Sequence, residues 1–249
     1  MEISFWLFIV FLILFEPIIG YFIFKRFKRN VKTSPGLRIK YYFYIIKGLW
    51  IPTVFIFSLV AFTDLKLHHI GLALPTINTD TLGTLTTYIG FSVGILYLLL
   101  LLYYGISYKY SKKAREKINQ ANQKQKNEVA YAEIFPVTPK EKKVWNYVSL
   151  TAGITEEIIY RGFLIYAILF LFPDMNIWLA ILISSVLFGL AHSYQGFTGV
   201  IKTTIIGLFF TIIYIGLGSI LPLILFHFCI DYIAKFGEHD QNNATKTVQ

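Results

Sequence analysis

Apolar stretches long enough to cross a lipid bilayer recur along most of the chain. A membrane-spanning helix needs about 20 consecutive, mainly apolar residues. Of the 249 residues, 55% are hydrophobic, and the mean hydropathy is +0.58. The stretches do not alternate polar and apolar residues, as the strands of a membrane barrel do. The sequence therefore predicts an all-α, polytopic helical membrane protein.

About seven transmembrane helices are expected. The predicted ranges are 3–24, 41–62, 84–106, 139–172, 176–192, 197–217 and 220–236. The fourth helix would be about 50 Å long at 1.5 Å per residue, too long for one upright span. Its first turns are therefore expected at the membrane surface, and a break near Gly153 would create an eighth element.

Positive charge is concentrated in two connections between the predicted helices. The chain has 23 Lys and Arg against 14 Asp and Glu, and most of the basic residues fall in 25–40 and 109–143. Lys and Arg near helix ends mark the cytoplasmic side, so the amino terminus is expected outside and the carboxyl terminus in the cytoplasm. Membrane lipids, and no nucleic acid, are the expected partners of these basic stretches. The Lys-, Ile- and Asn-rich composition favours a bacterial plasma membrane.

Three charged residues interrupt the apolar run TEEIIYRGFL, which covers 155–164: Glu156, Glu157 and Arg161. Each charge at the membrane centre costs roughly 2.5–3.5 kcal/mol even on the insertion scale, so three within six residues require a reason. Glu157 and Arg161 are four residues apart and can pair along one helix face, whereas Glu156 lies about 100° around the helix. Glu157 and Arg161 are therefore predicted to form a structural ion pair, which leaves Glu156 for chemistry.

Further ionisable residues stand in the later apolar runs. His192 ends the fifth predicted helix, and His227 and Asp231 lie four residues apart on one face of the seventh. All are predicted to lie in the cytoplasmic half of the membrane, as Glu156 is. Ionisable side chains there are expected to face a bundle interior or a water-filled cavity. Phe188, four residues before His192, is expected to pack beside it.

Two chemistries suit this set of side chains. Glu156, His192 and His227 could bind zinc and leave one position open, as catalytic zinc sites do. Alternatively, Glu156 could take a proton from water without a metal, while a histidine donates to the developing oxyanion. The sequence has neither the His-Glu-x-x-His string of soluble zinc proteases nor a Gly-x-Ser-x-Gly elbow. Cys229 lies two residues from His227, on a different helix face, which disfavours a cysteine nucleophile.

Three strings in this order resemble the CAAX-protease and bacteriocin-processing intramembrane peptidases (CPBP, also called Abi). The strings are Glu156-Glu157-x-x-x-Arg161, Phe188-x-x-x-His192 and His227-x-x-x-Asp231, and the resemblance covers about 152–233. It implies an endopeptidase in which Glu156 activates water beside His192. It also implies that His227 and the residue at position 231 stabilise the oxyanion. Metal dependence is unsettled for the family.

Asp231 departs from this family pattern, in which asparagine is common at the corresponding position. An ionised aspartate cannot donate a hydrogen bond to an oxyanion. Asp231 could instead be protonated, orient His227 or bind a metal. The sequence leaves these three roles open.

The chain is therefore expected to be an intramembrane metalloprotease or metal-free peptidase. It would hydrolyse a bond in a peptide or lipidated protein near the cytoplasmic face. The alternative is a non-catalytic bacteriocin-immunity or regulatory protein of the same fold. A proton-relaying transporter is disfavoured because the chain shows no internal repeat.

The sequence suggests four regions and one more intramembrane contact. The regions are an amino-terminal three-helix membrane region (1–106), a basic cytoplasmic loop (107–137), a catalytic four-helix membrane core (138–236) and a disordered tail (237–249). Thr138, Pro139 and Glu141 form the expected helix start of the core. Glu16 and Lys47 could meet as an intramembrane ion pair, or Lys47 could extend to the membrane surface.

Overall fold

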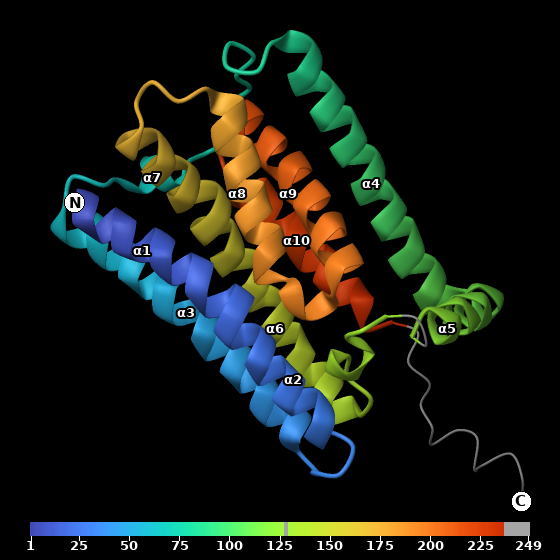
Figure 1. Ribbon diagram of the computed structural model, residues 1–249. Coiled ribbons are helices and arrows are strands. Elements are labelled where there is room, and N and C mark those ends of the chain that lie inside the picture. The colour runs from blue at the N-terminus through green and yellow to red at the C-terminus, as the bar shows by residue number, and fades with distance from the viewer. Residues whose placement is uncertain (127–128, 237–249) are drawn as a thin grey trace, which may run out of the picture.

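The computed structural model describes residues 1–126 and 129–236 as a bundle of helices, with no strand in these residues (Figure 1). The all-α class is confirmed. The predicted tail, 237–249, lies outside the described residues.

The helical elements follow one another along the chain, and η marks short 3-10 or π-helical segments. In chain order they are α1 (Glu2–Leu14), η1 (Phe15–Gly20), α2 (Tyr21–Asn30), α3 (Leu37–Phe62), η2 (Leu67–Ile70), α4 (Thr84–Tyr110), α5 (Lys112–Lys126), η3 (Ala132–Ile134), α6 (Pro139–Glu156), η4 (Glu157–Phe163), α7 (Leu164–Leu171), α8 (Ile177–Ala191), η5 (Ser193–Gln195), α9 (Phe197–Leu217) and α10 (Leu221–Ala234).

Four helices within the described residues are long and apolar enough to cross a membrane. They are Glu2–Asn30, Leu37–Phe62, Thr84–Tyr110 and Phe197–Leu217. The apolar helices α8 and α10 are shorter, and the rod formed by α6, η4 and α7 carries the three charges of the first motif. The polytopic helical membrane class is thus confirmed, whereas a total of seven spans stays a prediction.

The long fourth rod runs without interruption from α6 through η4 into α7. Its start has the predicted capping box: the Thr138 hydroxyl accepts from the Glu141 N–H, and the Glu141 carboxylate accepts from the Thr138 N–H. The helix passes through Gly153 without the break that would have made an eighth element, and it widens into the π-helix η4 at Glu157. Inserted π turns of this kind occur frequently at functional sites.

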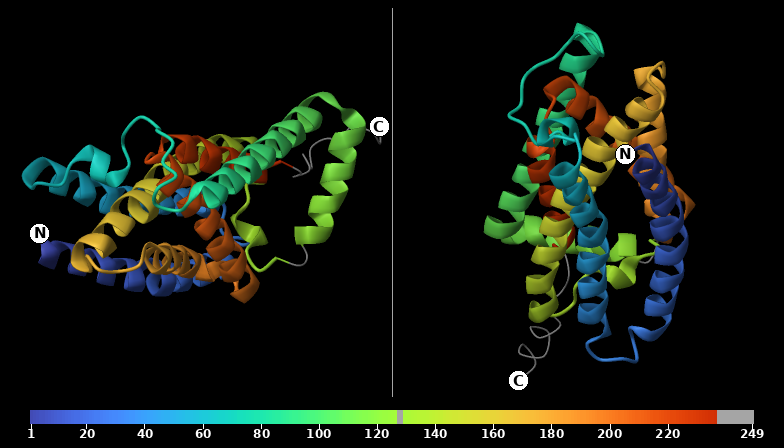
Figure 2. Two further views of the ribbon diagram at one scale, coloured as in Figure 1. Left: turned by 90° about the horizontal axis from the view of Figure 1, so that it is seen from above. Right: turned by 90° about the vertical axis from the view of Figure 1, so that its left-hand side faces the viewer.

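α6 lies between α3 and α10, while α8 packs along α9 (Figures 1 and 2). Gly153 allows α6 and α10 to approach closely, because a Cβ atom there would lie 2.9 Å from the carbonyl oxygen of Ile224. This approach positions the next turn of α6, with Glu156, against α10. A larger residue at position 153 would push the two helices apart.

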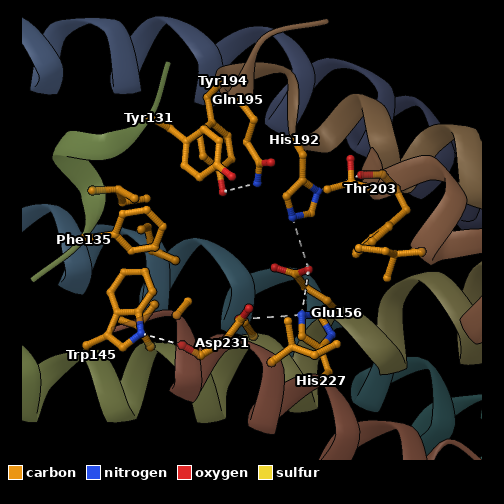
Figure 3. Close-up of a pocket in the computed structure, with 18 of the residues that line it drawn as sticks. Tyr131, Phe135, Trp145, Glu156, His192, Tyr194, Gln195, Thr203, His227 and Asp231 are labelled. Carbon is orange, nitrogen blue, oxygen red and sulfur yellow. Dashed lines mark hydrogen bonds and ion pairs between the residues drawn. The ribbon is translucent and has the colours of Figure 1, made fainter. Parts of the chain in front are cut away.

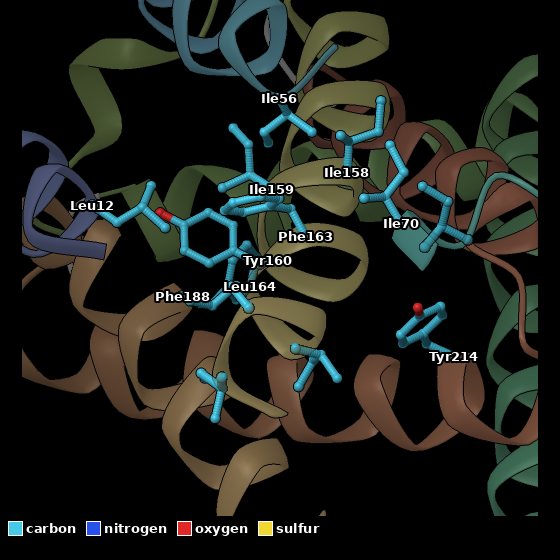
Figure 4. Close-up of a cluster of buried hydrophobic side chains, with 14 of the residues drawn as sticks. Leu12, Ile56, Ile70, Ile158, Ile159, Tyr160, Phe163, Leu164, Phe188 and Tyr214 are labelled. Carbon is cyan, nitrogen blue, oxygen red and sulfur yellow. The ribbon is translucent and has the colours of Figure 1, made fainter. Parts of the chain in front are cut away.

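The main hydrophobic core joins the amino-terminal helices to the rod that carries the charges (Figure 4). The Phe163 ring of η4 packs edge-on against Phe5 and Phe8 of α1, with ring centroids 5.1 and 4.7 Å apart. Ile56 of α3 is fully buried in the same cluster. The predicted 1–106 and 138–236 regions therefore share one core.

The two basic connections lie at the same end of the bundle, as expected for loops on one side of a membrane (Figure 1). The range 107–137, expected to be a loop, contains the helix α5 and the turn η3. Most residues of α5 are Lys, Ala, Arg, Glu and Gln, which favour a helix. The expected orientation, with the amino terminus outside, stays a prediction.

Candidate active site

A cavity of about 270 Å³ brings together the four residues singled out for chemistry (Figure 3). Glu156 is the last residue of α6, His192 caps the end of α8, and His227 and Asp231 project from successive turns of α10. The residues therefore come from three helices that are distant in the sequence. Their convergence depends on how α6, α8 and α10 pack.

The carboxylate of Glu156 faces both imidazoles. Its Oε2 atom lies 3.9 Å from Nε2 of His192 and 3.8 Å from Nε2 of His227. These separations are too long for direct hydrogen bonds. Oε2 is buried and has no hydrogen-bond partner among the described residues. The gaps are wide enough for one small molecule, such as water, to contact the carboxylate and an imidazole together.

The outer nitrogen of each histidine is held by an acceptor. Nδ1 of His192 lies 2.8 Å from the carbonyl oxygen of Phe188, and Nδ1 of His227 lies 2.7 Å from Oε1 of Glu157. A carbonyl oxygen and a carboxylate only accept hydrogen bonds, so Nδ1 carries the hydrogen in both rings. When neutral, each ring therefore presents the lone pair of Nε2 to Glu156. Such outer partners fix the tautomer and orientation of histidines at metal and catalytic centres.

The expected ion pair between Glu157 and Arg161 is present and fully buried. Nη1 of Arg161 lies 3.2 Å from Oε1 of Glu157, and the two side chains are 1% and 0% exposed. The guanidinium also lies over the rings of Phe188 and Phe210, at 4.0 and 5.4 Å from their centroids. Glu157 thus contacts both Arg161 and His227, and sequence spacing did not indicate the second contact.

Asp231 lies beside His227, one turn further along α10. Its Oδ2 atom is 3.7 Å from Nε2 of His227, and its side chain, 31% exposed, is the most accessible of the four. The backbone carbonyl of Asp231 accepts a hydrogen bond of 2.8 Å from the indole N–H of Trp145. This bond fixes the turn of α10 that carries Asp231 against α6.

Aromatic residues that the sequence did not single out line the cavity. Tyr131 and Phe135 come from the segment around η3, and Tyr194 comes from η5 (Figure 3). The Tyr42 hydroxyl fixes this segment by donating to the carbonyl of Ile134 at 2.6 Å. In the sequence, these aromatic residues stand beside an otherwise basic stretch. That pattern alone indicated that the segment packs against the bundle.

A charged contact also attaches this segment to α3. Nη1 of Arg38 lies 3.0 Å from Oε1 of Glu141, and the Arg38 Nε–H donates to the carbonyl of Glu133. Burial of the Glu141 carboxylate opposes its ionisation. The backbone N–H groups of Val137 and Thr138, together with Arg38, outweigh burial and lower the pKa of Glu141.

The possible ion pair between Glu16 and Lys47 does not form among the described residues, so the structure favours the alternative in which Lys47 extends away. Lys47 is exposed on α3, whereas the next two residues, Gly48 and Leu49, are buried. Glu16 lines a second cavity that Glu156 also borders. Lys47 therefore lies outside the faces on which α3 and η1 meet. Its side chain extends away from the site, as that of a lysine at the membrane surface would.

The predicted zinc ligands meet one requirement of a metal site. Their tautomers direct both Nε2 lone pairs toward the carboxylate, which is the donor set of a His₂Glu centre. Even so, no group of three or more His, Cys, Asp or Glu side chains in residues 1–126 and 129–236 is arranged to hold a metal ion. The present arrangement does not fit a bound metal, and zinc stays a prediction. Cys229 does not line the main cavity.

These features define a polytopic membrane protein with a buried centre of carboxylates and histidines. Residues 142–233, which include all three sequence motifs, match the family model described as type II CAAX prenyl endopeptidase Rce1-like. The resemblance predicted from the motifs is thereby confirmed over this part of the chain, and the match supports a hydrolase of the protease class. No curated protein and no solved structure shows a significant match to the chain.

Proposed function

We propose that this protein is an intramembrane endopeptidase that cleaves a peptide or lipidated protein near the cytoplasmic membrane face. One observation carries the proposal. At the wall of a cavity, Oε2 of Glu156 lies 3.9 Å from Nε2 of His192 and 3.8 Å from Nε2 of His227. Their separation suits a water molecule held between a base and an imidazole. The family match supplies independent support for peptide-bond hydrolysis.

In the proposed reaction, Glu156 is the general base. It takes one proton from a water molecule, whose second hydrogen is directed to the Nε2 lone pair of His192. The water oxygen then attacks the carbonyl carbon of the peptide bond and forms a tetrahedral oxyanion. Glu156 next delivers its proton to the departing nitrogen as the C–N bond breaks, so the products are a carboxylic acid and an amine. A positioned acid–base group contributes typically 10²–10⁴-fold to such a reaction.

His227 is the proposed donor to the oxyanion. Carboxylate oxygens of Glu157 and Glu156 lie 2.7 and 3.8 Å from its ring nitrogens. These two groups stabilise a positive charge on the imidazole, which then carries a hydrogen on Nε2 as well as Nδ1. Preorganised donors of this kind are worth about 10²–10³-fold in rate at other acyl-transfer centres.

The cavity gives the proposed substrate a mixed polar and aromatic environment. Trp145, Phe135 and Tyr131 line the cavity together with the catalytic groups. This arrangement suits an extended peptide that carries apolar or lipid-modified side chains. The description of the matched family adds prenylated proteins to the proposed substrate class. The protein would act in a bacterial plasma membrane, with its site open to the cytoplasmic side.

The test is cleavage of a quenched fluorescent peptide library, with and without a farnesylated cysteine, by purified protein in lipid vesicles. Glu156→Gln should abolish cleavage while the protein still inserts and folds. Glu116→Gln, at an exposed position of α5, is the matched control and should keep full activity. Retained cleavage by Glu156→Gln would remove it as the base.

Metal analysis of the same preparation tests the zinc prediction. Stoichiometric zinc that is lost in His192→Ala would support a metal centre formed by Glu156, His192 and His227. Full activity after exhaustive treatment with a chelator would support the metal-free reaction instead.

A further inference from the structure

A second, smaller cavity of about 70 Å³ lies beside the catalytic carboxylate. It shares Ile45, Ile134, Glu156, His192 and Tyr194 with the main cavity, but it is formed largely by η1 and α3. The proposed reaction uses no side chain from these two elements. We call this space the side cavity; its remaining polar residues are Glu16, Tyr41, Tyr44 and Tyr160.

Glu16 places an uncompensated carboxylate at the side cavity. Among the described residues it forms no ion pair and no hydrogen bond, and the partner that the sequence suggested, Lys47, is exposed elsewhere on α3. Gly20 makes room for the carboxylate, since a Cβ atom there would lie 3.1 Å from Oε2 of Glu16. A carboxylate at membrane depth normally has a charged or hydrogen-bonding partner. Glu16 has none within the described chain.

Two tyrosine hydroxyls at the same cavity also lack partners. Tyr160 is only 2% exposed and lines the side cavity, yet its hydroxyl has no hydrogen-bond partner among the described residues. The hydroxyl of Tyr44 is buried and likewise without a partner there. Buried polar groups are almost always hydrogen-bonded. The side cavity therefore presents several free acceptors around a negative charge.

The chemistry of these groups matches a primary ammonium. An ammonium carries three donors and no acceptor, so it can satisfy the Glu16 carboxylate and both hydroxyl oxygens together. Aromatic faces attract a cation at close range, and the apolar stem of a lysine can lie along Ile45 and Leu49, which also line the cavity. A cavity of this size accepts the end of a side chain rather than a whole residue.

We infer that the side cavity is a subsite for a lysine side chain of the substrate, and that Glu16 determines this specificity. The inference rests on the proposed peptidase function. Because the side cavity borders Glu156, the lysine belongs to a residue next to the cleaved bond. Glu16 binds the ammonium, and this contact helps to hold the scissile carbonyl against the base.

The experiment compares matched peptides that differ at one position. Each carries lysine, neutral norleucine or glutamate in one of the two positions on either side of the cleaved bond. The ratio of kcat/KM for the lysine peptide to that for the norleucine peptide is measured. Wild type should favour lysine by about tenfold to a hundredfold, the range of a charge-assisted hydrogen bond. Glu16→Gln should bring the ratio close to one.

Two further variants keep the result interpretable. Glu2→Gln removes an exposed carboxylate from the same helical rod and should leave the ratio unchanged. Gly20→Ala adds a methyl group against the Glu16 carboxylate and should lower the ratio without altering any charge. Gly20→Ala also tests the subsite if Glu16→Gln fails to fold.

The outcomes separate the subsite from the peptidase function. If wild type cleaves both peptides equally well, the subsite does not exist. If Glu16→Gln slows both peptides to the same extent, Glu16 serves water or stability rather than specificity, which also overturns the inference. If wild type cleaves no peptide of the set or the library, the peptidase function itself fails.

Discussion

Oε1 of Glu157 lies 2.7 Å from Nδ1 of His227, across 70 positions of sequence. The same oxygen lies 3.2 Å from Nη1 of Arg161. Glu157 therefore does more than neutralise the arginine beside it on the helix. It connects the buried guanidinium to the proposed oxyanion donor and fixes which nitrogen of His227 faces the cavity.

Glu157→Gln should lower kcat/KM about 10–100-fold, the size of loss seen when outer partners of catalytic histidines are changed. An amide can donate to Nδ1, which would favour the wrong tautomer of His227, and it supplies no negative charge. Steady-state cleavage and circular dichroism on the same preparation measure the effect. Unchanged kinetics in a folded Glu157→Gln variant would show that the contact is only structural.

Arg161→Ala should lower the amount of folded protein in the membrane more than Glu156→Ala does. Removal of one partner of a buried ion pair costs about 3–5 kcal/mol, because the other charge is left uncompensated. Glu156 has no partner within hydrogen-bonding distance, and His227 keeps its contact with Glu157 at 2.7 Å, so the loss of Glu156 breaks no close ion pair. Quantitative immunoblots of membrane fractions compare the variants. Equal abundance would contradict a stabilising role for the Glu157–Arg161 pair.

Asp231→Asn separates the proposed roles of Asp231. If a protonated Asp231 donates to the oxyanion, the asparagine variant should keep activity, since its amide also donates. It should also show a weaker activity loss at high pH, because the amide does not titrate. We expect this result, and rates measured across pH provide the test. A large loss at every pH would instead indicate an anion that orients His227 or binds a metal.

The contact between Arg38 and Glu141 should weaken in acid. The pKa of Glu141 is lowered in the folded protein, so its contribution to stability is present above its ordinary pKa. That contribution is lost as pH falls through the lowered value. Stability should therefore drop as the pH falls below about 4.5, the ordinary pKa of a glutamate, and Glu141→Gln should reduce that drop. Thermal unfolding at several pH values measures this loss of stability, with Glu116→Gln as the control. Identical pH profiles for wild type and Glu141→Gln would contradict a stabilising contact between Arg38 and Glu141.

The sequence by itself determined the features that depend on local spacing. Long apolar runs predict membrane helices whatever their partners, because backbone polar groups must pair within the helix in lipid. The capping box at Thr138 and the ion pair between Glu157 and Arg161 lie within one or two helical turns, so helix geometry alone predicts them. The order of the three motifs also indicated the family similarity found over residues 142–233.

Only the tertiary structure decided which helix faces meet. The contact between Glu157 and His227 requires α6 and α10 to pack closely at Gly153. The exclusion of Lys47, and the position of Glu16 beside Glu156, depend on which faces of η1 and α3 turn toward the site. Helical spacing fixes neighbours along one helix, but the rotation of one helix against another depends on packing over the whole interface. A sequence pattern therefore identifies the charged residues, and the packed bundle determines their partners.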